Sequence, residues 1–254
     1  MLILTILLSC SSLYNSKADY VETPTLDKEQ IQKFAWNYVY SLARVQNSDY
    51  VASLYAKYTI KYADKYRLNP FQLAKQGYAE SGLVHTNISC AGARGAWQII
   101  PLHWSHLLYH ISGGKLVPKL RKIEKSTGFT QKARKRLTYL THQEELTFKE
   151  EFEIHDLRVK RKNYLVAIRK FFYVVDYNCE MAAIIMKEFL SSYNGNLKTA
   201  LMAYRCGPYS KHFRDYQRDP SSADELQYIR YVTDDHFFHK ELDRLTPYRY
   251  IERI

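Results

Sequence analysis

The chain of 254 residues is poor in the residues that mark several non-globular classes. It has only 9 Gly and 7 Pro, too few for a collagen-like protein or for a chain dominated by linkers. The apolar run at residues 1–9 is far shorter than the ~20 residues that a membrane-spanning helix needs. The chain is instead long enough to bury a sizeable core, and with 46% hydrophobic and 25% charged residues its main state is predicted to be globular.

The amino terminus resembles a bacterial secretion signal. Residues 1–9 read as a signal h-region, and Leu7-Leu8-Ser9-Cys10 resembles a lipobox, which predicts lipidation of Cys10. Residues 1–19 are therefore interpreted as a signal or lipoprotein-like segment with a polar linker. No Lys or Arg precedes the apolar run, so two alternatives stay open: a start further upstream, or an ordinary apolar N-terminal segment.

The positive charge is concentrated in one segment. The chain carries 37 Lys and Arg against 26 Asp and Glu, a net charge of +11 that favours anionic partners. Residues 111–170 hold 16 of these basic residues and only 7 acidic ones, so the rest of the chain is nearly neutral. Leu, Phe and Ile are interspersed in this segment, which predicts a solvated helical hairpin. A further hypothesis is that it contacts an anionic wall polymer or a membrane surface.

The periodicity of apolar residues predicts helices almost throughout. Apolar residues recur at three- and four-residue intervals from Leu26 to Leu42 and again from Val51 to Tyr62. Asn69-Pro70 is typical of a helix start, and Cys206-Gly207-Pro208 of a helix end. Further helices are predicted over residues 178–190, 197–204 and 222–236. Between Gly82 and Gly95 small and polar residues predict a loop or a short hairpin.

Two ordered motifs resemble the lytic transglycosylases with a goose-type-lysozyme-like domain. Residues 78–101, YAESGLVHTNISCAGARGAWQIIP, match the active-site segment of that family, with its Glu-Ser at a helix end and its Gly-rich loop. Residues 186–208, MKEFLSSYNGNLKTALMAYRCGP, match its later motif. The resemblance implies an all-α, lysozyme-like fold. It also implies cleavage of the glycosidic bond between N-acetylmuramic acid and N-acetylglucosamine in peptidoglycan, with no metal or other cofactor.

The resemblance assigns roles to single residues. Glu80 would be the only catalytic acid and base, and no Asp or Glu follows it until residue 124. The product would carry a 1,6-anhydromuramoyl end. The residues implied to bind substrate or to support the acid are Ser81, Gln98, Asn178 and Tyr204. Trp97 stands where Met is common in the family and is a further candidate for substrate binding. Arg205 replaces the Asn that is usual in the second motif, and a Cys90–Cys206 disulfide is suggested only by the closeness of these residues to the motifs.

The motifs also divide the chain. Residues 20–66 are expected to form N-terminal helices packed on the catalytic domain, and residues 67–110 the first catalytic segment. Residues 111–170 are interpreted as an insertion, because the connection between the motifs is longer than usual. Residues 171–254 would be the second catalytic segment and the tail. A periplasmic or cell-envelope location is expected, with Cys10 as a possible lipid anchor.

Alternatives remain for the residues and for the function. Trp97 could stack on a sugar or fill the core, Gln98 could stabilise a loop, and Tyr204 could be a core tyrosine. His103, His106 and His110 would share one helix face, a pattern that could bind zinc. No Cys or carboxylate is near enough in the sequence to complete such a site, which favours a half-buried helix face beside Trp104. The rival functions are a muramidase on the same fold and a non-catalytic peptidoglycan-binding or assembly module. Nucleic acid is not expected as a partner, because no nucleic-acid-binding motif accompanies the charge.

Overall fold

The computed structural model describes residues 28–221, 223–235 and 238, and within them the fold is all-α. The chain divides into two compact units, residues 1–84 with 182–254 and His85–Met181. The boundaries of these units, after Val84 and after Met181, are not those of the segments expected from the motifs, and the functional division into those segments stays a prediction. Cys10 and the rest of residues 1–19 lie outside the described residues. None of the described helices has the length and hydropathy for a membrane span.

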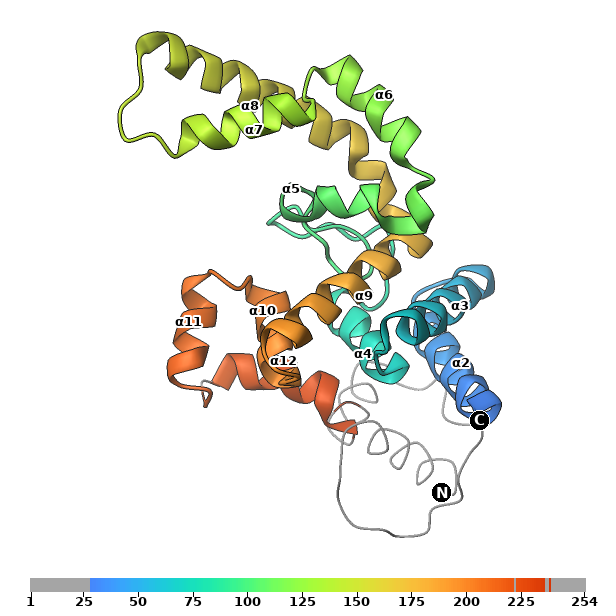
Figure 1. The fold of residues 1–254 in the computed structure, drawn as a ribbon. Coiled ribbons are helices and arrows are strands. Elements are labelled where there is room, and N and C mark those ends of the chain that lie inside the picture. The colour runs from blue at the N-terminus through green and yellow to red at the C-terminus, as the bar shows by residue number, and fades with distance from the viewer. Residues whose placement is uncertain (1–27, 222, 236–237, 239–254) are drawn as a thin grey trace. The chain divides into compact units, whose positions relative to one another are not determined.

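Two helices of the first unit begin at polar residues that cap them, and the predicted start at Asn69-Pro70 is confirmed. Ser48 and Asn69 cap α3 (Asp49–Tyr66) and α4 (Pro70–Ser81) by accepting hydrogen bonds from backbone N–H groups. Helix α2 (Lys28–Arg44) packs on both of them (Figure 1). The core between these helices contains fully buried side chains such as Tyr55, Tyr62 and Leu73.

The C-terminal half of the first unit contributes the remaining helices. They are the end of α9 (Val175–Ser192), then α10 (Leu197–Cys206), α11 (Lys211–Arg218) and α12 (Ala223–Thr233). Helix α10 ends at Cys206, as predicted, and α12 lies within the predicted final helix. Helix α11 was not predicted from the sequence. Helix α12 packs on α4 and on α10.

The second unit contains short helices and a long hairpin. Residues 101–114 form α5 (Pro101–Trp104), η1 (Ser105–Tyr109) and η2 (Ile111–Gly114). Helices α6 (Val117–Thr127), α7 (Gln131–Thr141) and α8 (Phe148–Ile168) follow, and then the short η3 (Arg169–Tyr173). Helices α7 and α8 lie side by side, which confirms the predicted helical hairpin (Figure 1).

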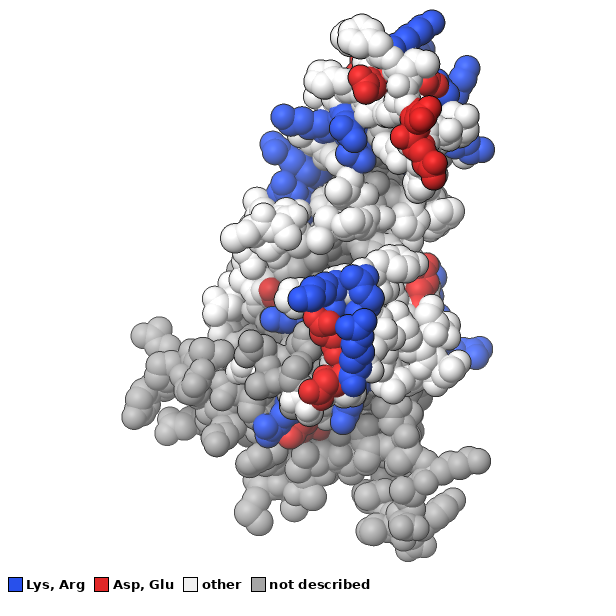
Figure 2. Space-filling model, turned by 90° about the vertical axis from the view of Figure 1, so that its left-hand side faces the viewer, with Lys and Arg blue, Asp and Glu red and all other residues white. Residues whose placement is uncertain are grey.

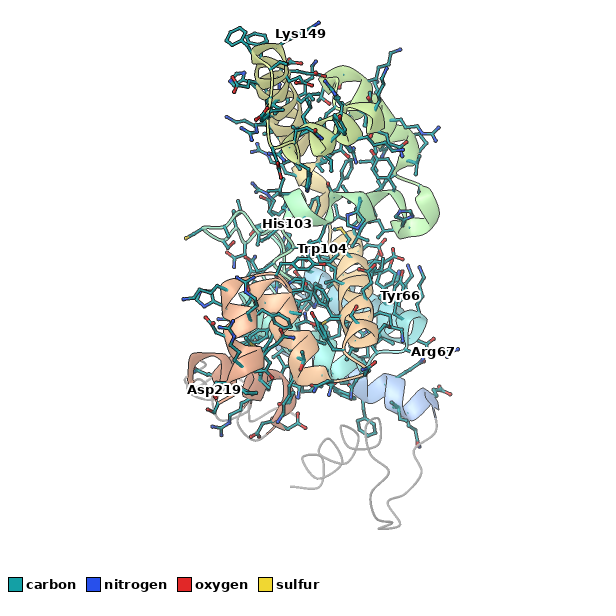
Figure 3. All side chains as sticks on the ribbon, turned by 60° about the vertical axis from the view of Figure 1, so that its left-hand side comes forward. Tyr66, Arg67, His103, Trp104, Lys149 and Asp219 are labelled. Carbon is teal, nitrogen blue, oxygen red and sulfur yellow. The ribbon has the colours of Figure 1, made fainter. Side chains whose placement is uncertain are left out.

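The hairpin is fixed by a helix cap and by ion pairs. Thr147 and Glu150 form a capping box at the start of α8. Arg136 of α7 donates to the carboxylate of Glu153 at 2.8 Å and lies 3.6 Å from that of Glu150. Lys149 lies at the far end of the hairpin (Figure 3). These contacts join the two helices near the connecting turn.

The charge of the insertion is not uniform. Residues 115–136 hold nine Lys and Arg with one Glu, and residues 158–170 hold six with no acidic residue. Residues 141–157, around the turn of the hairpin, hold six Asp and Glu with one Lys. Blue and red atoms accordingly occur together at the upper end of Figure 2. The expectation of an anionic partner therefore applies to two segments of the insertion and not to its tip.

Candidate active site

Glu80 lies in the last turn of α4, on a backbone that bends sharply after it. Gly82 ends the helix with φ +67°, and its N–H bonds back to the carbonyls of Gly77 and Tyr78. Leu83 also has a positive φ, and its carbonyl accepts a hydrogen bond from the Asn47 side chain at 3.2 Å. The helix end that carries Glu80 is thus held from two sides.

The Glu80 carboxyl is half-buried and receives a hydrogen bond from a distant tyrosine. The hydroxyl of Tyr228, on α12, donates to Glu80 Oε1 at 2.8 Å. Burial raises the pKa of Glu80, while the bond from Tyr228 and the charge of Arg205 act in the opposite direction. Burial is the largest of these effects, so the net shift favours the protonated acid. A carboxyl of this kind can deliver a proton near neutral pH.

Tyr228 and Arg205 form the surroundings of this carboxyl. Tyr228 is buried, and both its burial and the negative charge of Glu80 raise the pKa of its phenol. The guanidinium of Arg205 lies over the Tyr228 ring at 4.6 Å from the ring centroid. Arg205, the departure from the family motif, thereby supports the residue that contacts Glu80. Tyr228 was not predicted from the sequence, because it lies outside both motifs.

The other predicted residues of this unit lie close to Glu80 in the chain or in space. The Ser81 hydroxyl accepts a hydrogen bond from the N–H of Val84 at 3.1 Å and so supports the turn. Tyr204 is half-buried and close enough to Tyr228 for its charge to raise the Tyr228 pKa. The structure therefore brings Glu80, Tyr204, Arg205 and Tyr228 together. The roles of Ser81 and Tyr204 toward substrate stay predictions.

Helix α12 is fixed to α4 by further contacts near this carboxyl. Tyr78 stacks on Tyr231 with ring centroids 6.4 Å apart. The ammonium of Lys75, whose side chain is only 1% exposed, lies 2.7 Å from Asp235 Oδ1. Tyr231 lies on α12 and Asp235 lies two residues after its end, so the stacked rings and the buried ion pair together position the helix that carries Tyr228.

In the second unit, Asn178 and Trp97 belong to a buried connection and not to an open surface. Trp97 is 0% exposed and Asn178 is 1% exposed. Asn178 Oδ1 accepts from the N–H of Trp97 at 3.0 Å, and its Nδ2 donates to the carbonyl of Arg94 at 3.1 Å. Stacking of Trp97 on a sugar is therefore not supported, and the core alternative holds. Asn178 is a positioning residue for the loop, because its buried amide bonds to two backbone groups of that loop.

The same loop explains Gly95 and Gln98. Gly95 has φ +78°, and a Cβ there would lie 2.4 Å from the Phe172 carbonyl oxygen, so only glycine fits. Gln98, with φ +48°, donates through Nε2 to the carbonyl of Gly95 at 2.8 Å. The predicted short hairpin is confirmed only as isolated bridges from Arg94 to Ile88 and Ile99.

Two expectations about side-chain chemistry are corrected by the second unit. Cys90 is a free, exposed thiol, so the suggested Cys90–Cys206 disulfide is absent. His103, His106 and His110 are exposed and do not share one helix face, because α5 gives way to η1 after Trp104. Within the described residues no group of three or more His, Cys, Asp or Glu is placed to hold a metal ion.

The loop geometry leads to a prediction about stability. Asn178→Ala leaves the buried N–H of Trp97 and the carbonyl of Arg94 without their partner. We expect it to lower the free energy of unfolding by about 3 kcal/mol. Urea unfolding followed by tryptophan fluorescence measures this effect. Asn163→Ala, at an exposed position of α8, is the control and should change stability by about 0.5 kcal/mol or less. Equal effects of the two substitutions would contradict the positioning role of Asn178.

No protein-family model, curated protein or solved structure matches this chain. The assignment of a function consequently depends on the motifs and on the geometry around Glu80.

Proposed function

We propose that this protein is a peptidoglycan lytic transglycosylase of lysozyme-like fold, with Glu80 as its acid and base. The observation that carries the proposal is the half-buried Glu80 carboxyl, with its raised pKa and its hydrogen bond from Tyr228. The motifs around Glu80 and Tyr204 support the substrate class. Residues 1–19 with Cys10 support an envelope location as part of the same proposal.

The arrangement suits a reaction with one carboxyl. Protonated Glu80 would give its proton to the oxygen between the two sugars, and the bond from that oxygen to the muramoyl C1 would break. Glu80, now a carboxylate, would take the proton of the C6 hydroxyl while the C6 oxygen bonds to C1. Tyr228 donates to one carboxyl oxygen, which leaves the other oxygen to carry the transferred proton.

Analysis of the products tests this reaction against its closest rival. Purified sacculi digested with the protein should release muropeptides with 1,6-anhydromuramoyl ends, measured by mass spectrometry. A muramidase on the same site would add water and give reducing muramic ends. Reducing ends as the main product would refute the transglycosylase and favour hydrolysis.

The role of Tyr228 leads to a pH-dependent prediction. Tyr228→Phe removes a hydrogen bond that lowers the Glu80 pKa, so the Glu80 pKa should rise further. Glu80 then remains protonated to higher pH, so the alkaline limb of the pH profile of kcat should shift to higher pH. We also expect kcat to fall by about tenfold, because the carboxyl loses its orientation.

Tyr231→Phe is the matched control for this experiment. It removes a hydroxyl from the same helix, and the neighbouring Tyr78 ring remains stacked on it. Its alkaline limb should match that of the wild type. The same shift in both variants would mean that general loosening of α12, and not the hydrogen bond to Glu80, explains the result.

A further inference from the structure

The second unit contains a cavity that the proposed reaction does not use. It has a volume of about 220 Å³ and lies among α5, η1, α7 and α8. Leu137, Leu165 and Phe129 form its apolar part. Arg134 and Arg161 bring two guanidinium groups to the same space. Such a combination of apolar surface with a few convergent polar groups is typical of a ligand site.

Arg161 is the uncompensated charge of this cavity. Its side chain is half-buried, and within the described part of the chain it has no hydrogen bond or ion pair. The hydroxyls of Ser105 and Thr138 also line the cavity, and neither makes a hydrogen bond to another described residue. Partial burial of a guanidinium without an acceptor is unfavourable. No carboxylate of the described residues lines the cavity to balance the charge of Arg161, and the hydroxyls that line it are neutral.

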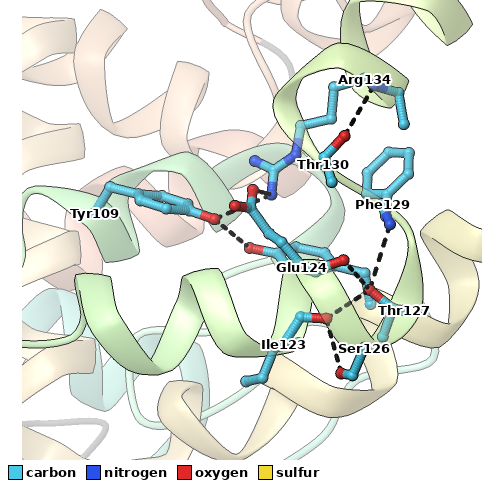
Figure 4. Close-up of polar contacts among 10 residues, drawn as sticks. Tyr109, Ile123, Glu124, Ser126, Thr127, Phe129, Thr130 and Arg134 are labelled. Atoms are coloured by element: carbon cyan, nitrogen blue, oxygen red, sulfur yellow. Dashed lines mark hydrogen bonds and ion pairs between the residues drawn. The ribbon is translucent and has the colours of Figure 1, made fainter.

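Arg134 provides a second, preorganised donor. It is fixed by Glu124, whose carboxylate lies 2.8 Å from its Nη2, and by the hydroxyl of Tyr109 at 3.2 Å (Figure 4). Its guanidinium also lies 4.6 Å from the centroid of the Tyr164 ring. Its Nε is buried and has no partner among the described residues. Because Glu124 balances the charge of Arg134, the net positive charge of the cavity comes from Arg161.

We propose that this cavity binds one compact oxyanion, a carboxylate or a phosphate group, with Arg161 as its main partner. A guanidinium binds both groups through two parallel N–H bonds, and the charge on each side strengthens these bonds. The volume is below the ~300 Å³ of ordinary small-molecule pockets, so it suits a single charged group and not a disaccharide. The proposal is independent of the reaction at Glu80.

Calorimetric titration of the full-length protein with sodium phosphate and with sodium acetate tests the proposal. At low ionic strength we expect one site with millimolar affinity for at least one anion, above a chloride control. Tighter binding of phosphate indicates a phosphorylated polymer or lipid headgroup as the natural source, and tighter binding of acetate indicates a carboxylate. Absence of binding above chloride would overturn the proposal.

Two substitutions on α8 test whether the anion binds to the cavity or is attracted by the positive charge of the helix as a whole. Arg161→Gln should weaken binding by about tenfold or more. Arg158→Gln removes the same charge from an exposed position of α8 that does not line the cavity, and it should change the affinity by about twofold or less. Equal weakening in both variants would overturn the proposal.

Arg161→Lys and a measurement of helix content distinguish loss of the anion contact from loss of the fold. The lysine keeps the charge but loses the paired donors, so we expect an affinity between those of the wild type and Arg161→Gln. Circular dichroism should show the same helix content in all three variants. If Arg161→Gln unfolds, Arg161→Lys decides the question: affinity equal to that of the wild type would refute the paired contact.

Discussion

Glu80→Gln is expected to reduce the release of anhydromuropeptides from purified sacculi by about 10²-fold to 10⁴-fold. Gln has nearly the same shape, but it cannot give a proton to the glycosidic oxygen or take one from the C6 hydroxyl. Positioned acid and base groups contribute rate factors of this size. The loss should appear in kcat, because the amide can still contact a bound glycan strand.

The same variant should be folded and at least as stable as the wild type near neutral pH. Burial raises the pKa of Glu80 in the folded protein, so the ionised carboxyl is disfavoured there. The wild type should lose stability as the pH rises from the unfolded pKa through the higher folded one, because the unfolded state ionises first. The amide of the variant cannot ionise, so this loss should be absent from Glu80→Gln. Urea unfolding at pH 4 and at pH 8 would measure it.

Glu188→Gln is the control for both measurements. Glu188 is exposed on α9 in the same unit, so its substitution should leave turnover and stability unchanged. Turnover by Glu80→Gln at the wild-type rate would refute the catalytic role of Glu80. The non-catalytic binding module would instead be favoured by a different result. In that case the wild type binds glycan strands without cleaving them, and Glu80→Gln binds the strands with the same affinity.

Local signals in the sequence explain why much of the fold was predictable. Ser48 and Asn69 are caps whose side chains satisfy backbone N–H groups within three residues, and Gly82 is a stop that requires a positive φ. These interactions involve neighbours in the chain, so the sequence alone indicates them. Helix α11 shows the limit, because its eight residues carry only a short apolar pattern.

The contacts around Glu80 could not be predicted in the same way. Tyr228 is 148 residues from Glu80 along the chain, and Asp235 is 160 residues from Lys75. Each is one Tyr or Asp among many in the tail, and nothing local distinguishes it. Such pairs arise from the packing of α12 on α4, which depends on the whole unit.

The motifs located the residues of the loop but did not settle what their side chains do. Trp97 lies within the first motif and Asn178 precedes the second, yet both are buried and joined to each other by a hydrogen bond. A motif fixes residue types and spacing, whereas the direction of a side chain depends on the backbone. Gly95 shows this most clearly, because the close approach of the Phe172 carbonyl is what requires glycine there.

The buried ion pair between Lys75 and Asp235 leads to a large expected effect on both stability and turnover. Asp235→Asn leaves the ammonium of Lys75 buried without its charged partner. We expect the free energy of unfolding to fall by about 3 kcal/mol, because removing one member of a buried pair leaves an uncompensated charge. Turnover should fall as well, since the pair holds α12, and with it Tyr228, against the helix of Glu80. Urea unfolding and muropeptide release measure the two effects.

Two variants test whether the buried charge of Lys75 causes the loss of stability in Asp235→Asn. Lys75→Met combined with Asp235→Asn removes both charges, so it should recover most of the lost stability, as an apolar side chain of similar length can fill the site. Asp215→Asn is the control, because its pairs with Lys211 and Arg218 are exposed and 4.0 and 3.8 Å long, and it should cost about 0.5 kcal/mol or less. If Asp235→Asn costs no more than Asp215→Asn, the ion pair does not hold α12 on α4, and the position of Tyr228 depends on the stacked rings of Tyr78 and Tyr231.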